Sequence, residues 1–401
     1  MAAPLKLKRQ AIAKVPQGSS PIAKHLPIAS ILVDTPVSHL EGIYDYLVPE
    51  ILDADSVVGS KVLVDFGNAK AEGIIIQRKD KSDQDKKLKP ILELASPSGL
   101  VSKSMLEHVE SVRNRFGGSF WSILNSSIPG RVLKEEKVLV NNEINGVLPP
   151  YESPEIREII GRADYGQLLG KQRIKWGISF PLAVDPNWFL VEVVKLRAQV
   201  SQVLLLVPDE KDITYLTALL SSVFGEGVVE LGSHLSKSVR YRNFLRSRYN
   251  SPSVIISTRS GAFTHLEKNA TVIVLSDLDE SHYEIHAPGW NTRDVTLLRD
   301  NNTSLIFLSA SHSLEIARLI EIGWLEKKMY RRKSSQKFFT NESGNSYIFS
   351  IKKGISSGNA LVSVAEKGYA NLFLCYRCRN TANCECGGKP VSYTHLTLPT
   401  I

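Results

Sequence analysis

The sequence predicts an α/β protein of several domains, in which a small, mostly β domain precedes a larger domain built on a parallel sheet. Three observations lead to this prediction. The chain has 401 residues, more than one typical domain holds. Short runs of β-branched and aromatic residues dominate the first hundred residues. Further along, fully apolar runs alternate with helical stretches, which indicates buried parallel strands joined by helical crossovers.

The charge of the chain favours a polyanionic partner, since 49 basic residues against 41 acidic ones give a net charge of +8. Residues 1–26 are predicted to be a disordered basic arm. This arm either adds salt-sensitive contacts to nucleic acid or is a solvated tail. It contains no acidic residue, and its cations are Lys6, Lys8, Arg9, Lys14 and Lys24.

The sequence contains no segment typical of membrane insertion or secretion. Its apolar runs are all shorter than the roughly 20 residues that cross a bilayer. The N-terminal arm has no apolar stretch of the kind that a secretory signal needs. We therefore expect a cytoplasmic protein without a membrane partner.

Residues 27–100 are predicted to form the mostly β domain. Ile43–Val48 reads as a strand that ends at Pro49, and Lys61–Phe66 reads as a second strand closed by Gly67. Tyr44 and Tyr46 offer flat faces to a nucleobase, and the Asp45 carboxylate can accept hydrogen bonds from a ribose hydroxyl or a base edge. Alternatively, the two tyrosines are packing residues of a β-barrel core.

Residues 101–155 are predicted to be a helical bridge followed by a linker. Ser102 is a suitable N-cap. The helix that it begins has an apolar face and ends at Gly117-Gly118. That face carries Met105, Val109, Val112 and Phe116.

Residues 156–330 are predicted to form one RecA-like lobe. Its apolar strands lie within 202–208, 253–258, 271–276 and 304–309. The chain contains no G-x-x-x-x-G-K-[ST] phosphate loop, and the corresponding region, 174–194, has one glycine and two prolines. The lobe is therefore predicted to be degenerate, and no catalytic residue is assigned. An acidic group follows the third of these strands and consists of Asp277, Asp279 and Glu280. It is either a remnant metal site or a solvated loop.

The last part of the chain begins with a basic, loop-rich connection, 331–368. The cysteine-rich region 369–390 follows and holds all four cysteines of the chain. In a reduced compartment, four cysteines within twelve residues indicate zinc ligands and not disulfides. They are Cys375, Cys378, Cys384 and Cys386. Residues 391–401 look like a translated sequencing adapter, so we expect them not to belong to the natural chain.

Three boxes in order resemble the 3′-end-binding domain of the PriA family of replication restart proteins. They are YDYLVP from Tyr44, VGSKVLVDFG from Val58 and LKPILELAS from Leu88. The resemblance implies a pocket for the terminal 3′ nucleotide of a nascent strand, in which Lys89 neutralises a phosphate and Gly67 admits the nucleotide close to the backbone. The implied pocket residues are Tyr44, Asp45, Tyr46, Gly67 and Lys89.

The α/β segment resembles the first helicase lobe of the same family. STRSGAF (257–263), VIVLSDLDESH (272–282) and FLSASHSLE (307–315) stand where that lobe has three of its motifs, the second being Walker B. The missing phosphate loop resembles the actinobacterial branch, which keeps the fold without recognisable helicase motifs. This implies a lobe without helicase activity, leaves open whether ATP still binds, and implies that Arg259 and Arg293 are structural remnants or DNA contacts.

The resemblance implies a protein that recognises abandoned replication forks and promotes primosome assembly and reloading of the replicative helicase, without helicase activity. Its expected partners are forked DNA, primosome and helicase-loading proteins, and single-stranded DNA-binding protein, at the nucleoid. An alternative is an ATP-dependent 3′–5′ DNA helicase with divergent motifs. A third is a zinc-ribbon module in RNA or transcription work, which leaves the N-terminal boxes unexplained.

The family binds two zinc ions through eight cysteines in interleaved order. Carried over, this would give Cys375 and Cys378 to one ion, and Cys384 and Cys386 to the other. Each site would then be half built in this chain, and we expect the natural protein to continue with the missing ligands and a second lobe.

Overall fold

The computed structural model describes residues 21–35, 40–82, 84, 87–138, 151–181, 184–330 and 347–358. The chain divides into two compact units, Met1–Ser334 and Ser335–Ile401. In the second unit, the described residues form one amphipathic helix, α10 (Tyr347–Ser357), with Phe349 and Ile355 exposed. None of the helices in the described ranges has both the length and the apolar character that crossing a bilayer requires.

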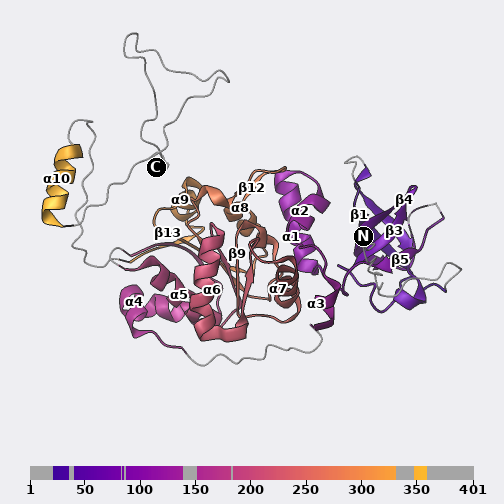
Figure 1. Ribbon diagram of the computed structural model, residues 1–401, viewed down its shortest axis with the longest axis horizontal. Coiled ribbons are helices and arrows are strands. Elements are labelled where there is room, and N and C mark those ends of the chain that lie inside the picture. The colour runs from indigo at the N-terminus through magenta and orange to yellow at the C-terminus, as the bar shows by residue number, and fades with distance from the viewer. Residues whose placement is uncertain are drawn as a thin grey trace, which may run out of the picture. The chain divides into compact units, whose positions relative to one another are not determined.

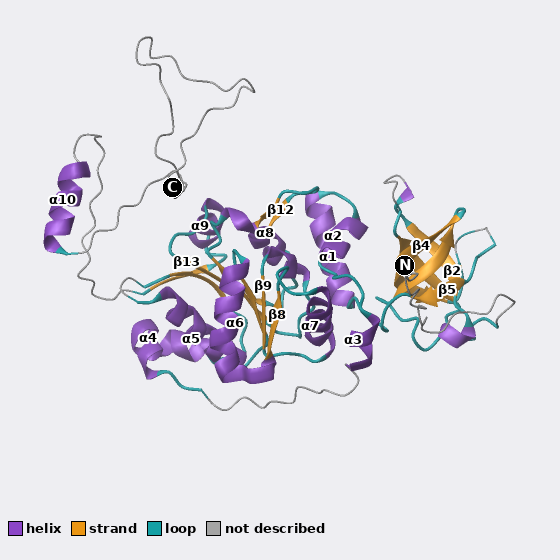
Figure 2. Cartoon of the chain, viewed as in Figure 1, coloured by secondary structure: helices purple, strands orange, loops and turns teal. Residues whose placement is uncertain are grey.

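The first unit begins with a five-stranded antiparallel sheet (Figures 1 and 2), which confirms the mostly β domain that the sequence predicts. Alternate residues of its strands build one apolar core, which includes Ile31, Val64 and Ile91. The strands lie in the order β2-β1-β4-β3-β5. Their bounds are β1 (Ile28–Val33), β2 (Ile43–Leu47), β3 (Lys61–Phe66), β4 (Ala69–Lys79) and β5 (Ile91–Leu94).

The sheet curls until its two edges touch at one point. Leu47, at the end of β2, donates its N–H to the carbonyl of Lys89 over 2.9 Å, and Leu47 also forms a parallel bridge with Pro90. This closure brings the residues before β5 beside the strand that carries the tyrosines.

Three short helices follow the β domain: α1 (Lys103–Phe116), α2 (Phe120–Ser126) and α3 (Leu133–Val138). Ser102 caps α1 as predicted, because its hydroxyl accepts the N–H of Met105 over 3.2 Å. The apolar face of α1 packs on the parallel sheet that follows in the chain. His108 joins this packing, its Nε2 lying 2.8 Å from the Val295 carbonyl, and burial lowers its pKa to about 3.

The larger sheet has seven strands, all in parallel pairs, in the order β14-β6-β13-β10-β7-β9-β8. The four predicted strands form its centre. Their bounds are β7 (Val203–Leu206), β9 (Val254–Ser257), β10 (Thr271–Leu275) and β13 (Ser304–Ser309). Three strands that the sequence analysis did not predict complete the sheet: β6 (Lys175–Ser179), β8 (Val228–Leu231) and β14 (Glu326–Met329).

Helices cover both faces of this sheet, which is the predicted RecA-like arrangement (Figure 2). One face packs on α4 (Pro154–Leu168), α5 (Pro186–Ala198) and α6 (Glu210–Phe224). The other face packs on α1, α2 and α9 (Leu314–Glu321). The remaining elements are α7 (Lys237–Tyr249), α8 (Thr292–Leu297) and the hairpin β11 (Tyr283–Glu284) and β12 (Trp290–Asn291).

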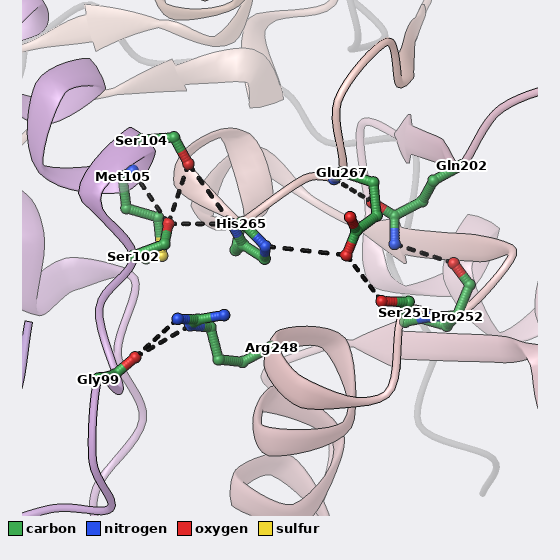
Figure 3. Close-up of polar contacts among 10 residues, drawn as sticks. All are labelled: Gly99, Ser102, Ser104, Met105, Gln202, Arg248, Ser251, Pro252, His265 and Glu267. Carbon is green, nitrogen blue, oxygen red and sulfur yellow. Dashed lines mark hydrogen bonds and ion pairs between the residues drawn. The ribbon is translucent and has the colours of Figure 1, made fainter. Parts of the chain in front are cut away.

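The start of α1 is fastened to the end of α7 and to the loop before β10 (Figure 3). Arg248 donates to the Gly99 carbonyl over 2.8 Å. His265 places its Nδ1 2.9 Å from the Ser102 hydroxyl and its Nε2 4.0 Å from Glu267. Burial, and then the nearby Arg248 cation, lower the pKa of His265 to about 4. His265 is therefore neutral at pH 7 and acts as a hydrogen-bonding link.

Candidate nucleic-acid interface

One end of the β domain gathers an aromatic ring, a glycine turn and a cation. Tyr44 of β2 meets Phe66 of β3 edge-on, with ring centroids 4.9 Å apart. The Lys89 ammonium lies 3.4 Å from the Gly67 carbonyl. The closure between β2 and the segment before β5 brings Lys89 to this end of the sheet. The structure thus brings together three of the predicted site residues: Tyr44, Gly67 and Lys89.

Gly67 has the backbone conformation and the open surroundings that the predicted pocket requires. Its φ of +58° lies in the left-handed region, where glycine is the favoured residue. A Cβ built there has no neighbour within 4 Å, so the space beside the turn is open. Lys89 and the residues of the turn are exposed. A nucleotide can therefore approach the backbone here without displacing a side chain.

Tyr46 is a packing residue of the β-domain core, which is the second of the two roles considered for the tyrosines. It is 5% exposed and belongs to the apolar core of the β domain. Its hydroxyl donates to the Asp65 carbonyl over 3.2 Å, and burial raises its pKa to about 12. Its ring thus supports Tyr44 and the β3 turn from inside and does not offer a free face to a base.

Asp45 lies on the other side of β2 from the two tyrosines, because side chains alternate along a strand. Its carboxylate accepts hydrogen bonds from the hydroxyls of Ser30, at 2.7 Å, and Ser82, at 2.5 Å, and pairs with Lys79 at 2.9 Å. Burial alone would raise the pKa of Asp45, but the bonds from Ser82, Lys79 and Ser30 outweigh it and lower the pKa. The structure does not bring Asp45 together with Tyr44 and Lys89.

In the larger domain, the place predicted to correspond to a phosphate loop is the turn between β6 and α5. Asp185 caps α5, and its Oδ1 accepts the N–H groups of Asn187 and Trp188 at 2.8 and 3.1 Å. Backbone N–H groups at a helix N-terminus are those that bind phosphate in nucleotide sites. Here an internal carboxylate occupies them, and Pro186, in the first turn, has no N–H to offer.

The carboxylate of Asp277, at the position predicted to correspond to Walker B, also has its partners within the protein. The carboxylate is buried and accepts bonds from Ser309 Oγ at 2.5 Å and His312 Nδ1 at 2.9 Å through Oδ1, and from the Ser313 N–H at 2.8 Å through Oδ2. Burial would raise its pKa, but these hydrogen bonds outweigh it and hold the pKa of Asp277 below its ordinary value. Asp279 and Glu280 lie on an exposed 3-10 turn, apart from this group.

The two arginines singled out by the sequence both have carboxylate partners. Arg259 pairs with Glu284 at 3.0 Å. Arg293 pairs with Asp294 at 2.8 Å and Glu315 at 3.0 Å and is 8% exposed. Of the two alternatives, structural remnant or DNA contact, the structure favours a structural role for both.

Helix α7 is basic, and the sequence-based prediction did not single it out. The segment KSVRYRNFLRSRY contains five cations and no acidic residue, which is the signal that could have singled it out. The four cysteines lie outside the described residues, as do most of the connection 331–368, the arm up to residue 20 and the tail 391–401. Within the described ranges, no group of three or more potential metal ligands occurs.

A cavity of about 1160 Å³ lies between the outer face of the first sheet and α1. Its floor is apolar and includes Leu32, Ile76 and Leu106. At its rim, Lys103 and Arg113 pair with the glutamates of their own helix, Glu107 and Glu110. The lining is apolar, and these two cations are already neutralised by glutamates of the same helix. Such a cavity does not suit a phosphate backbone, so it is not part of the candidate interface.

Residues 30–129 match the family described as the PriA 3′ DNA-binding domain (3′BD). The match begins within β1, ends after α2 and contains the Tyr44, Gly67 and Lys89 group. Proteins with similar sequences point to the same family as this domain match. The chain is similar in sequence to replication restart proteins PriA. It is 26% identical over 390 residues to the probable replication restart protein PriA of Mycobacterium tuberculosis (strain CDC 1551 / Oshkosh), covering 89% of this chain and 58% of the relative.

The similarity to PriA extends beyond one group of bacteria. The PriA of Rickettsia prowazekii is 22% identical over 378 residues, covering 89% of this chain and 56% of that protein. The chain therefore spans less than two thirds of the length of these relatives. Among solved structures, the Pyrococcus furiosus Hef helicase domain is 16% identical, with a TM-score of 0.32 and 44% of this chain and 40% of that chain covered. RecG bound to a three-way DNA junction is 12% identical, with a TM-score of 0.33 and coverage of 59% and 30%.

Proposed function

We propose that this chain acts in replication restart by binding forked DNA at the 3′ end of the nascent strand. One observation carries the proposal: the match to the 3′ DNA-binding domain contains an open glycine turn flanked by Tyr44 and Lys89. A 3′ terminal nucleotide has one phosphate and one exposed base, and this end of the sheet offers a cation, an aromatic ring and an accessible backbone for them.

The parts of the site have distinct roles in this proposal. The Tyr44 ring, braced by Phe66, stacks on or borders the terminal base. Lys89 neutralises the last phosphate, and Gly67 lets the sugar approach the chain. Tyr46 supports the turn from the core. Asp45 retains its predicted role at the 3′ end, which it would exert through strand β2, since its carboxylate faces the opposite side.

The proposal includes no ATP-driven strand separation. Asp185 occupies the helix N-terminus where a nucleotide phosphate would bind, and Asp277 uses both oxygens within the protein. Both arrangements support a lobe that serves as a scaffold, and no described residue favours the alternative of an active 3′–5′ helicase. The proposal extends to primosome and helicase-loading proteins, to single-stranded DNA-binding protein, and to zinc held by Cys375, Cys378, Cys384 and Cys386.

The test is a binding titration with two forks that differ only at the nascent strand, whose 3′ end is either a free hydroxyl or blocked by a phosphate. Fluorescence anisotropy gives both dissociation constants at one salt concentration. The fork with the free 3′ end is expected to bind more tightly. Equal constants for the two forks would overturn the proposal of 3′-end recognition.

A further inference from the structure

Helix α7 is strongly basic, but most of its cations are already engaged. Arg242 pairs with Glu135 at 3.4 Å, and Arg246 pairs with Glu226 at 2.8 Å. Arg248 donates to the Gly99 carbonyl. These three side chains hold α7 to neighbouring elements, so they are not free to meet a ligand.

Lys237 and Arg240 are different. Among the described residues, neither has a hydrogen-bond or ion-pair partner, and Lys237 is exposed. Two glutamates of α3 contact this end of α7, and both already have partners. Glu135 accepts from Ser238 and Arg242. Glu136 binds Arg131 through both oxygens, at 2.7 and 2.9 Å, and also accepts from Tyr241. The charges of Lys237 and Arg240 are therefore not neutralised by these two glutamates at the start of α7.

The two cations face the same neighbouring segment, the turn between α2 and α3. A Cβ on Gly130 would lie 3.1 Å from Cε of Lys237, so the lysine stem rests on that glycine. Arg240 borders a hollow of about 20 Å³ that Ser127 and Pro129 of the same turn line together with Ser260. A hollow of this size holds a single water. It cannot enclose a nucleoside, so a ligand here would lie across the surface.

We propose that Lys237 and Arg240 bind the phosphodiester backbone of a duplex arm of the fork, as a second DNA contact separate from the 3′-end site. This inference rests on the proposed function. Two cations without partners among the described residues favour a polyanionic ligand. The ligand should be extended, because the hollow is too small to hold a compact one. Binding of single strands without sequence preference usually adds exposed aromatic rings for stacking. The aromatic side chain that lines this hollow, Phe244, is buried, which favours duplex DNA.

The test measures the salt dependence of binding by the whole chain to a plain duplex, a single strand and the 3′-blocked fork. The double variant Lys237→Gln/Arg240→Gln removes the two cations that have no partner among the described residues. Two phosphate contacts contribute about 1.8 to the slope of log K against log salt, so the slope on duplex and blocked fork should fall by about that amount. Between 50 and 200 mM salt, the affinity of the variant should therefore fall by a factor roughly 12-fold smaller than the factor by which the parent's affinity falls.

The matched control removes two cations of the same helix that are already paired, Arg242→Gln/Arg246→Gln, and should leave the slope unchanged. The conservative variant Arg240→Lys keeps the charge and should retain the parent slope. Circular dichroism melts verify that each variant is folded. An unchanged slope in the Lys237/Arg240 variant, or an equal loss in the control, would overturn the inference. A loss confined to the single strand would overturn the assignment to duplex DNA.

These outcomes separate the inference from the proposed function. The Lys237/Arg240 variant should weaken binding to free and blocked forks by the same factor, so the ratio of the two constants stays as in the parent chain. If the parent chain does not distinguish the two forks, 3′-end recognition fails, while the salt slope on duplex still decides the role of α7.

Discussion

Tyr44 and Asp45 are consecutive residues of β2 whose side chains point to opposite sides of the strand. The Tyr44 ring meets Phe66 at the open end of the sheet. The Asp45 carboxylate is bound by Ser30, Ser82 and Lys79 on the other side. Substitutions at the two positions should therefore have separable effects, one on DNA binding and one mainly on the stability of the β domain.

Tyr44→Ala should weaken binding to forks with a free 3′ end, because it removes the ring that we propose borders the terminal base. One stacked base contributes roughly 1–3 kcal/mol, which corresponds to about a 5- to 150-fold loss of affinity. Tyr44→Phe keeps the ring and should bind like the parent chain. Anisotropy titrations with free and blocked forks measure both variants. Parent-like binding of a folded Tyr44→Ala chain to free-end forks would exclude the ring from the site.

Asp45→Asn should destabilise the β domain by about 1–3 kcal/mol, because the lost charge weakens the bonds from Lys79 and the two serines. The pKa of Asp45 is lowered in the folded protein. Its contribution is therefore fully present above about pH 4, the unfolded pKa of Asp, and is lost as the pH falls through the folded pKa. Urea unfolding at pH 7 and below pH 4 should show the variant and parent converging at acid pH.

The same variant tests the predicted role of Asp45 at the 3′ end. If that role is exerted through strand β2, the folded Asp45→Asn chain should bind free-end forks less tightly while its affinity for blocked forks stays the same. A folded variant with parent affinity for both forks would remove Asp45 from the site and leave it a purely structural residue.

Strands and turns of the candidate site could be predicted because their signals are local. The β-branched runs, the closing Gly67 and the Ser102 cap each depend on a few neighbouring residues. The position of Asp45 was not predicted because Tyr44, Asp45 and Tyr46 are neighbours in sequence, whereas alternate residues of a strand face opposite sides. Strand β14, with the sequence EKKM, was missed because it is a charged edge strand and lacks the apolar run of a central one.

Other features could not be predicted because they depend on pairing between distant segments. Lys89 reaches the site only through the contact between Leu47 and the residues before β5. The two cations of α7 that have no partner in the described part of the chain can be recognised only once the partners of its other arginines are known. Glu135, for example, lies more than one hundred residues before Arg242 in the chain.

His265→Gln should change how stability depends on pH. Burial lowers the pKa of His265 to about 4, against an ordinary 6.5. The neutral form is favoured on folding, so its contribution is complete above about pH 6.5 and is lost as the pH falls toward 4. The variant should lose less stability than the parent over this window. Denaturant unfolding at pH 7.5 and pH 5 measures it, with His25→Gln, at an exposed position, as control. Identical pH dependence in His265→Gln and parent would contradict a buried neutral histidine.

Zinc should bind to this chain and leave it readily. A closed structural site needs four ligands on one ion, and the chain has only four cysteines. If they are divided between two ions as the family resemblance implies, each ion receives two of them. Elemental analysis before and after dialysis against a mild chelator measures the metal, and Cys375→Ser/Cys378→Ser serves as the comparison. One zinc per chain that resists dialysis would instead indicate a self-contained four-cysteine site.

The chain should show no DNA-stimulated ATPase, and Asp277 should matter for stability alone. Asp277→Asn leaves the Ser309 and His312 groups without a charged acceptor in a buried place, which costs about 1–3 kcal/mol. Asp279→Asn, two residues away on the exposed turn, should leave stability unchanged. Phosphate release with forked DNA should be absent in the parent and in both variants. Turnover near or above about 1 s⁻¹ in the parent, lost in Asp277→Asn, would show that Asp277 serves a nucleotide and that the lobe is an active motor.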